Sequence, residues 1–254
     1  MMKKNKIRTL TLALAAAVLA GVGQNALAHT RLEVPLVTEN VRVTNNVTIG
    51  HGCGEKAIIG TSVVFPDGTD STITVGGQPH NGTLTDFVSN WGPNVQPLQT
   101  RAVFDFVDEK QGPTGNVVGF WSGGGSGMPA HMNAFVPFRV SATNIEPTSC
   151  AKSVKFFVSI VDICEITGID ALRSGSGESG GPVNLWTHNN LGTPYDRVGA
   201  EDDGPASLTI NRDLTNNPLP GSCNGGVDVE VKPSAAQINR DMPIKFNGQQ
   251  VWPQ

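Results

Sequence analysis

The stretch Thr61–Gly77, which reads TSVVFPDGTDSTITVGG, decides the fold class of this 254-residue chain. It holds two short runs rich in Val, Ile and Thr, residues 61–65 and 71–75, and each run is followed by a turn sequence, Pro66–Gly68 or Gly76–Gly77. β-Branched residues favour strands, whereas clusters of Pro, Asp and Gly favour turns. The stretch therefore predicts two short β-strands, each ended by a tight turn.

The same pattern of short apolar runs and turn residues continues along most of the chain. No stretch longer than about ten residues carries the apolar stripe of an amphipathic helix. Many short strands separated by turns are typical of an antiparallel β-sandwich, so we predict an all-β fold. The further strands predicted are residues 41–49, 100–107, 117–121, 134–140, 154–161, 206–210 and 227–231.

Three segments are predicted to be loops. Gly123–Met132 is rich in Gly, and Arg173–Pro182 is a Gly/Ser stretch of low complexity. Beyond Asn190 the chain is polar and rich in Pro and Gly. We therefore expect residues 191–254 to form a loop-rich C-terminal extension appended to the sandwich, held by Cys223 if that residue is bridged.

Residues 1–28 have the features of a secretory signal peptide. A basic start precedes the apolar run Leu10–Val22, and Ala26–Ala28 supplies a small-x-small cleavage pattern. Cleavage after Ala28 would give a periplasmic or secreted protein whose first residue is His29. An N-terminal histidine offers its free α-amine and its ring Nδ1 at a fixed separation. Two nitrogen ligands of this kind suit Cu(II), so His29 is a candidate copper chelate.

Charge and cysteine content narrow the function classes further. The formal net charge is −4, and removal of the basic signal makes the chain more acidic, which argues against nucleic acid or an anionic membrane as partner. After the signal no run reaches the ~18 apolar residues of a membrane-spanning helix, so we expect no transmembrane segment in the mature chain. Four cysteines in an exported protein predict two disulfide bonds, and the count alone leaves three pairings open.

Four further stretches stand out in order along the chain. They are HTRLE (29–33), HGCG (51–54) with VVFPDG (63–68), WSGG (121–124) with MP (128–129) and FVPFR (135–139), and FFVSIVDICE (156–165). Together they resemble the YcnI-like domain family of exported bacterial copper-binding proteins, and Trp186 then falls near the late tryptophan of that family. The resemblance covers about residues 29–186, and we expect the YcnI-like β-sandwich domain to span residues 29–190.

The resemblance implies an immunoglobulin-like β-sandwich with a copper site built on His29. It also implies that Trp186 lies beside the metal and that a carboxylate contributes. Glu33 would share a strand face with His29, whereas Glu39 lies after a turn at Pro35 and would have to fold back. The implied function is copper binding, with Cu(II) buffered or delivered to another periplasmic or membrane copper protein.

The resemblance also implies how the cysteines pair. Cys53 and Cys164 match the two cysteines of the family's HGC and TCE segments, so we expect them to pair with each other. Cys150 and Cys223 are additional to the family pattern and are left to form a second disulfide bond.

An enzyme is the first alternative, although no acid–base pair or activated nucleophile stands out. Gly177–Pro182 reads GESGGP, one residue different from the GDSGGP of trypsin-like proteases, but too few residues precede His51 to build the strands of such a barrel. A copper-dependent oxidative enzyme would need a second histidine, for which His131 or His188 would have to serve.

Two further alternatives remain open from the residues. Met128, His131 and Met132 lie within five residues of one another, and thioether sulfur favours Cu(I), so they form a second candidate copper site. The other alternative is a structural or adhesive β-sandwich that binds no metal.

Overall fold

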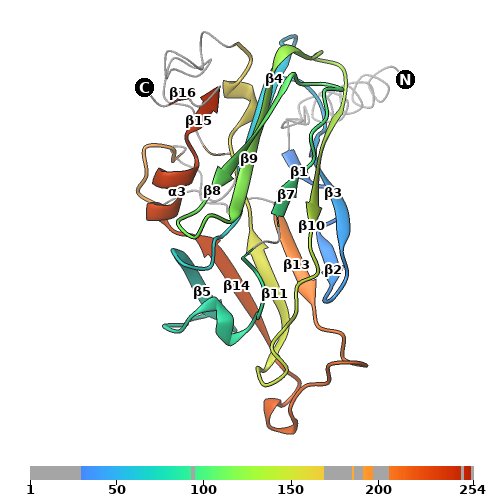
Figure 1. Ribbon diagram of the computed structural model, residues 1–254, viewed down its shortest axis with the longest axis vertical. Coiled ribbons are helices and arrows are strands. Elements are labelled where there is room, and N and C mark those ends of the chain that lie inside the picture. The colour runs from blue at the N-terminus through green and yellow to red at the C-terminus, as the bar shows by residue number, and fades with distance from the viewer. Residues whose placement is uncertain are drawn as a thin grey trace, which may run out of the picture.

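The structure is a computed structural model that describes residues 30–92, 95–168, 185, 191–196, 206–246 and 249–252. These residues form three β-sheets, a separate hairpin and one short α-helix, arranged as an elongated body (Figure 1). The expected fold class, an all-β sandwich, is confirmed. No helix among the described residues is long and apolar enough to cross a membrane.

The first sheet has the strand order β1-β3-β10-β7, with all neighbours antiparallel. In β3 and β10 buried residues alternate with more exposed ones, as the two-residue period of a strand requires when one face lies on a core. Val47, Ile49, Val136 and Phe138 point inward into the main core. The strands are β1 (Thr30–Leu32), β3 (Val43–Ile49), β7 (Val95–Pro97) and β10 (Ala134–Val140).

The second sheet has the order β2-β13-β11-β14-β5-β6 and mixes parallel with antiparallel pairs. β13 pairs with β2 in parallel, β14 pairs with β11 in parallel, and the remaining pairs are antiparallel. The expected antiparallel sandwich is confirmed, and the second sheet adds two parallel pairs to it. The strands are β2 (Leu36–Thr38), β5 (Ser71–Val75), β6 (Gln78–Pro79), β11 (Ala151–Phe157), β13 (Ser207–Asn211) and β14 (Val227–Pro233).

The C-terminal part of the chain is integral to this second sheet. β13 and β14 flank β11 on its two sides, and their inward residues, among them Leu208 and Val229, lie in the main core (Figure 1). The prediction that residues 191–254 are a loop-rich extension appended to a domain ending at residue 190 does not agree with this arrangement. The sequence pattern found both strands but could not show that they pair with the centre of the sheet.

The third sheet has the order β12-β4-β9-β8, and it is buried on both faces along β4 and the first half of β9. Val63 and Phe120 face the main core, whereas their neighbours Val64 and Trp121 face a second, smaller core. Residues next to each other on a strand point to opposite faces, so both faces of the sheet are covered there. The strands are β4 (Ile58–Val64), β8 (Phe106–Gln111), β9 (Val117–Met128) and β12 (Ser159–Ile160).

A C-terminal unit covers the outer face of the third sheet. It consists of the helix α3 (Ala235–Asp241) and the hairpin of β15 (Ile244–Phe246) and β16 (Gln249–Trp252). Ser234 caps α3 by accepting a hydrogen bond from the Gln237 backbone N–H. Ile238, Met242 and Trp252 pack with Trp121 in the second core.

One predicted strand and one predicted loop differ from the structure. Residues 100–107 were expected to form a strand, but β8 begins only at Phe106. The expected Gly123–Met132 loop is strand as far as Met128, because β9 pairs with β4 again at Met128 after an irregularity between Gly123 and Met128. Gly123 is needed for packing, because a Cβ there would lie 2.1 Å from the Trp121 ring, and one on Gly60 of β4 would lie 2.3 Å from it. Gly124, Gly125 and Gly127 have positive φ, a conformation that favours glycine.

Both disulfide pairings expected from the resemblance are confirmed. Cys53–Cys164 joins the segment after β3 to the 3₁₀ turn Ile163–Glu165, with a Cα–Cα distance of 5.3 Å. Cys150–Cys223 joins the residue before β11 to the 3₁₀ turn Gly221–Cys223, with a Cα–Cα distance of 5.2 Å. Both bonds connect segments far apart in sequence.

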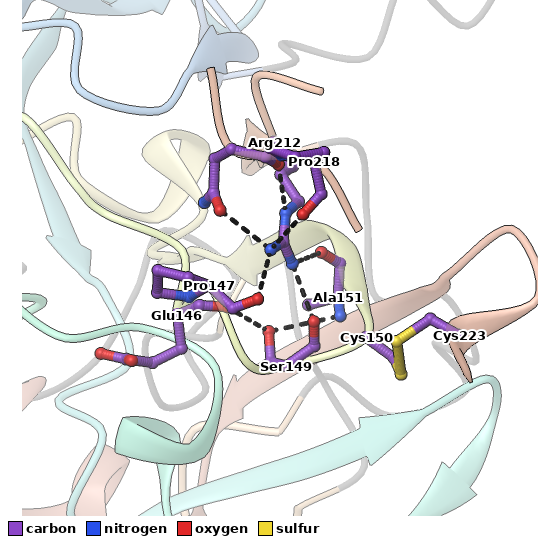
Figure 2. The surroundings of a disulfide bond; sticks show 9 residues. Glu146, Pro147, Ser149, Cys150, Ala151, Arg212, Pro218 and Cys223 are labelled. Carbon is purple, nitrogen blue, oxygen red and sulfur yellow. Dashed lines mark hydrogen bonds between the residues drawn. A yellow bond between two sulfur atoms is a disulfide. The ribbon is translucent and has the colours of Figure 1, made fainter. Parts of the chain in front are cut away.

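Arg212 holds the loops beside the second disulfide (Figure 2). Its guanidinium is buried and donates to the backbone carbonyls of Pro147, Ser149, Ala151, Asn217 and Pro218 and to the Asn217 side chain. A buried cation is tolerated here because its donors have carbonyl partners. The loops on either side of β11 and β13 are therefore fixed at this end of the molecule.

Candidate metal site

Thr30, the first residue that the structure describes, already lies in β1 of the first sheet. Thr30 is 1% exposed, and its position in β1 is opposite Ile49 of β3, which in turn is opposite Ala134 of β10. His29 itself lies outside the described residues. A chain cleaved after Ala28 would therefore have its free amine one residue before a strand that is anchored in the sandwich.

Two histidines lie close in sequence to Ile49 and Ala134, at the same end of the first sheet as Thr30. His51 follows Ile49, and its Nδ1 lies 2.7 Å from the Gly52 carbonyl oxygen. His131 precedes Ala134, and its Nε2 lies 3.2 Å from the Glu55 carboxylate, with both side chains highly exposed. Glu55, 76 residues from His131, is a residue that the sequence analysis missed. Only the fold brings these two side chains together.

Glu33 is exposed beside β1. Its backbone N–H donates to the Asn46 carbonyl at 2.9 Å, so the pairing of β1 with β3 continues one residue past Leu32. The Asn46 side-chain amide donates to the Glu33 carboxylate. Because Arg31 is also exposed, Arg31 and Glu33 follow the outward alternation of the strand. Glu33 is thus a carboxylate near the chain start that is open to solvent.

Glu39 does not fit the expectation that it folds back toward His29. It lies between β2 and β3, at the end of β3 marked by Val43, whereas Thr30 is opposite Ile49 at the other end. A strand of this length spans about 20 Å. Glu39 is also 2% exposed, so it is neither near the chain start nor open to solvent.

The Glu39 carboxylate has a structural use instead. It accepts hydrogen bonds from the backbone N–H of Ile145 at 2.9 Å and of Asp213 at 2.8 Å, and both of its oxygens accept from the Asn217 side-chain amide. Asn217 in turn binds Arg212. Glu39 therefore anchors the loops at the end of the molecule that also carries the Cys150–Cys223 disulfide.

The alternative copper site at Met128, His131 and Met132 is not assembled. Met128 is 1% exposed and belongs to the main core, whereas Met132 is 56% exposed. Trp186, His188 and the GESGGP segment at 177–182 lie outside the described residues. Within the part of the chain that the structure describes, no three His, Cys, Asp or Glu side chains are grouped so that they could hold a metal ion.

The comparisons with known proteins find similarity in structure but not in sequence. No family model matches the chain, and no curated protein matches it by sequence. A solved structure described as an uncharacterized protein from Nocardia farcinica with an immunoglobulin-like fold is similar at a TM-score of 0.38 and 11% sequence identity. That similarity covers 73% of this chain and 98% of the other chain.

Proposed function

We propose that this protein is exported and binds one copper ion through the α-amine and Nδ1 of His29. The observation that carries the proposal is that Thr30, two residues after the predicted cleavage site, is buried and paired with β3. A chelate at a flexible chain end loses conformational entropy when it binds a metal. An N-terminal histidine next to an anchored strand loses less of it, which favours binding.

The carboxylate that best completes the site is Glu33. It is exposed, it is four residues from His29, and its neighbour Arg31 shows the same outward direction. The two disulfide bonds agree with export to an oxidising compartment such as the periplasm or the exterior of the cell. The role proposed is to buffer Cu(II) or to deliver it to another periplasmic or membrane copper protein.

The test is Cu(II) titration of protein purified after export, with its start confirmed by intact mass. A start at His29 and one tight Cu(II) site are expected. His29→Ala should lose most of the affinity, and so should a variant with one extra residue before His29, because the amine is then moved away from the imidazole. Glu33→Gln should weaken binding less. Glu230→Gln, which changes a partly exposed carboxylate on β14, serves as the matched control.

Electron paramagnetic resonance of the Cu(II) form separates the alternatives. Coordination by the amine and one imidazole supports the proposal. Coordination by two imidazoles that is lost in His131→Ala would point to the oxidative-enzyme alternative. No specific Cu(II) site in a protein that starts at His29 would contradict the proposal and leave a metal-free structural sandwich.

A further inference from the structure

A polar cavity of about 220 Å³ lies between the third sheet and the C-terminal unit. Asp108 and Lys110 of β8 line it, together with Trp121 of β9, Asp241 of α3 and Lys245 of β15. In the β8–β9 register Asp108 is opposite Trp121, and Lys110, two residues further along the strand, is on the same face. The proposed copper site uses none of these residues.

Lys110 is buried in the wall of this cavity, which is unusual for a lysine. Its residue is 9% exposed, and its Nζ donates to the backbone carbonyls of Met242 at 3.0 Å and Pro243 at 2.6 Å. Both carbonyls directly follow α3. Among the described residues, no carboxylate forms an ion pair with Lys110. The amine is therefore held by neutral acceptors away from bulk water.

This environment favours the neutral amine. Burial lowers the pKa of Lys110 to about 7, an effect that Lys245 increases and that Asp241 and Asp108 oppose. The remaining charged groups at the cavity are Glu109, on β8, and Arg240, whose guanidinium pairs with Asp67, Asp70 and Asp241. Near pH 7, a substantial fraction of Lys110 carries no charge.

The hydrogen bonds also orient the neutral amine. A neutral Nζ has two hydrogens and one lone pair, and the two carbonyls of Met242 and Pro243 take both hydrogens. The lone pair is then left in the one remaining tetrahedral direction. A lysine that is desolvated and held in this way is the form in which lysine acts as a nucleophile toward carbonyl carbon.

We propose that Lys110 is a reactive amine that forms a Schiff base with small carbonyl compounds, aldehydes or 2-oxo acids, that enter this cavity. The Nζ lone pair forms a bond to the carbonyl carbon while the carbon–oxygen π bond breaks, and one nitrogen proton ends on the oxygen. The resulting carbinolamine loses its hydroxyl group and the second nitrogen proton as water, which leaves the imine. The Asp108 carboxylate, on the same wall, is the group placed to carry the proton from nitrogen to oxygen.

The test uses the full wild-type protein with two probes, glyoxylate as a charged 2-oxo acid and acetaldehyde as a neutral aldehyde. Each is incubated with the protein from pH 6 to pH 9, reduced with borohydride, and mapped by peptide mass spectrometry. Lys110 should be labelled several-fold faster at pH 7 than Lys152 and Lys155, whose side chains are more exposed, and its rate should level off above about pH 7 while theirs keeps rising. Faster labelling by glyoxylate would identify 2-oxo acids as the class of compound that the cavity accepts. Faster labelling by acetaldehyde would identify neutral aldehydes.

Labelling of Lys152 and Lys155 without Lys110 would overturn the proposal and leave Lys110 as a structural tie between β8 and the C-terminal unit. Lys110→Arg keeps hydrogen-bond donors for the two carbonyls but removes the nucleophile, so the fast labelling should disappear. Lys152→Arg is the matched control and should leave the fast labelling of Lys110 unchanged. His29→Ala should label at the wild-type rate, because this inference does not depend on copper binding.

Discussion

At the residue scale, two glutamates that the sequence could not tell apart have different uses. Glu33 is exposed beside β1, whereas Glu39 is buried and accepts hydrogen bonds from Ile145, Asp213 and Asn217. A carboxylate whose oxygens already accept hydrogen bonds from buried donors stabilises the fold and is not available to bind a metal. One that faces solvent near the chain start is open to a metal.

This difference predicts opposite effects of the same substitution at the two glutamates. Glu39→Ala should lower the free energy of unfolding by about 1–3 kcal/mol, because buried donors lose their acceptor, and should leave Cu(II) affinity unchanged. Glu33→Ala should leave stability unchanged and weaken Cu(II) binding. Urea denaturation and Cu(II) titration of both variants measure this, and a Glu39 variant that folds normally but loses copper would reverse the assignment.

The lowered pKa of Lys110 predicts that the free energy of unfolding depends on pH. Its pKa is lowered to about 7 in the folded protein, from 10.5 for a free lysine. Between these two values the unfolded chain binds more protons than the folded one, so the free energy of unfolding rises with pH across this window and is constant below it. Lys110→Met should lose this rise. Urea denaturation from pH 6 to pH 10 gives the difference in slope, and parallel curves for the two proteins would show that Lys110 is charged in the folded state.

At the scale of the elements, β9 shows why glycine is required inside a strand. Trp121 lies across the outer face of the third sheet, and a Cβ on Gly60 or Gly123 would meet its ring at 2.3 or 2.1 Å. Trp121 packs there with Trp252 and Met242, so the ring cannot move without disturbing the second core. Gly60 and Gly123 therefore leave the space that the Trp121 ring occupies.

Substitution of Gly60 should be costly for this reason. Gly60→Ala should lower the free energy of unfolding by about 1–3 kcal/mol through overpacking against Trp121. Gly221→Ala is the control, because a Cβ there has nothing within 4 Å, and it should change stability by less than about 0.5 kcal/mol. Equal stability of the two variants in urea would show that Trp121 moves aside at little cost.

At the scale of the whole molecule, the second sheet is closed by segments that come late in the chain. β11 has β13 on one side and β14 on the other, and both come after residue 206. The Cys150–Cys223 disulfide and the contacts of Arg212 hold the same segments to the start of β11. The C-terminal unit then covers the outer face of the third sheet.

A chain cut after residue 190 should consequently fail to fold. It would leave β11 without either neighbour, Cys150 without its partner and Glu39 without two of its donors. Exposed strand edges of this kind pair with other chains, so the truncated protein should aggregate. Circular dichroism and size-exclusion chromatography test this, and a monomeric, cooperatively folding fragment 29–190 would restore the boundary expected from the sequence.

The sequence by itself determined the local features of this protein. The two-residue alternation and the turn residues located β5 and β10 at their observed bounds. The resemblance of four sequence stretches to the YcnI-like domain family gave the correct cysteine pairs. Only the tertiary structure decided that β13 and β14 flank β11, that Glu39 lies far from the chain start, and that Lys110 is buried. The physical reason is that side-chain periodicity records which face of a strand is covered, but not which distant segment covers it.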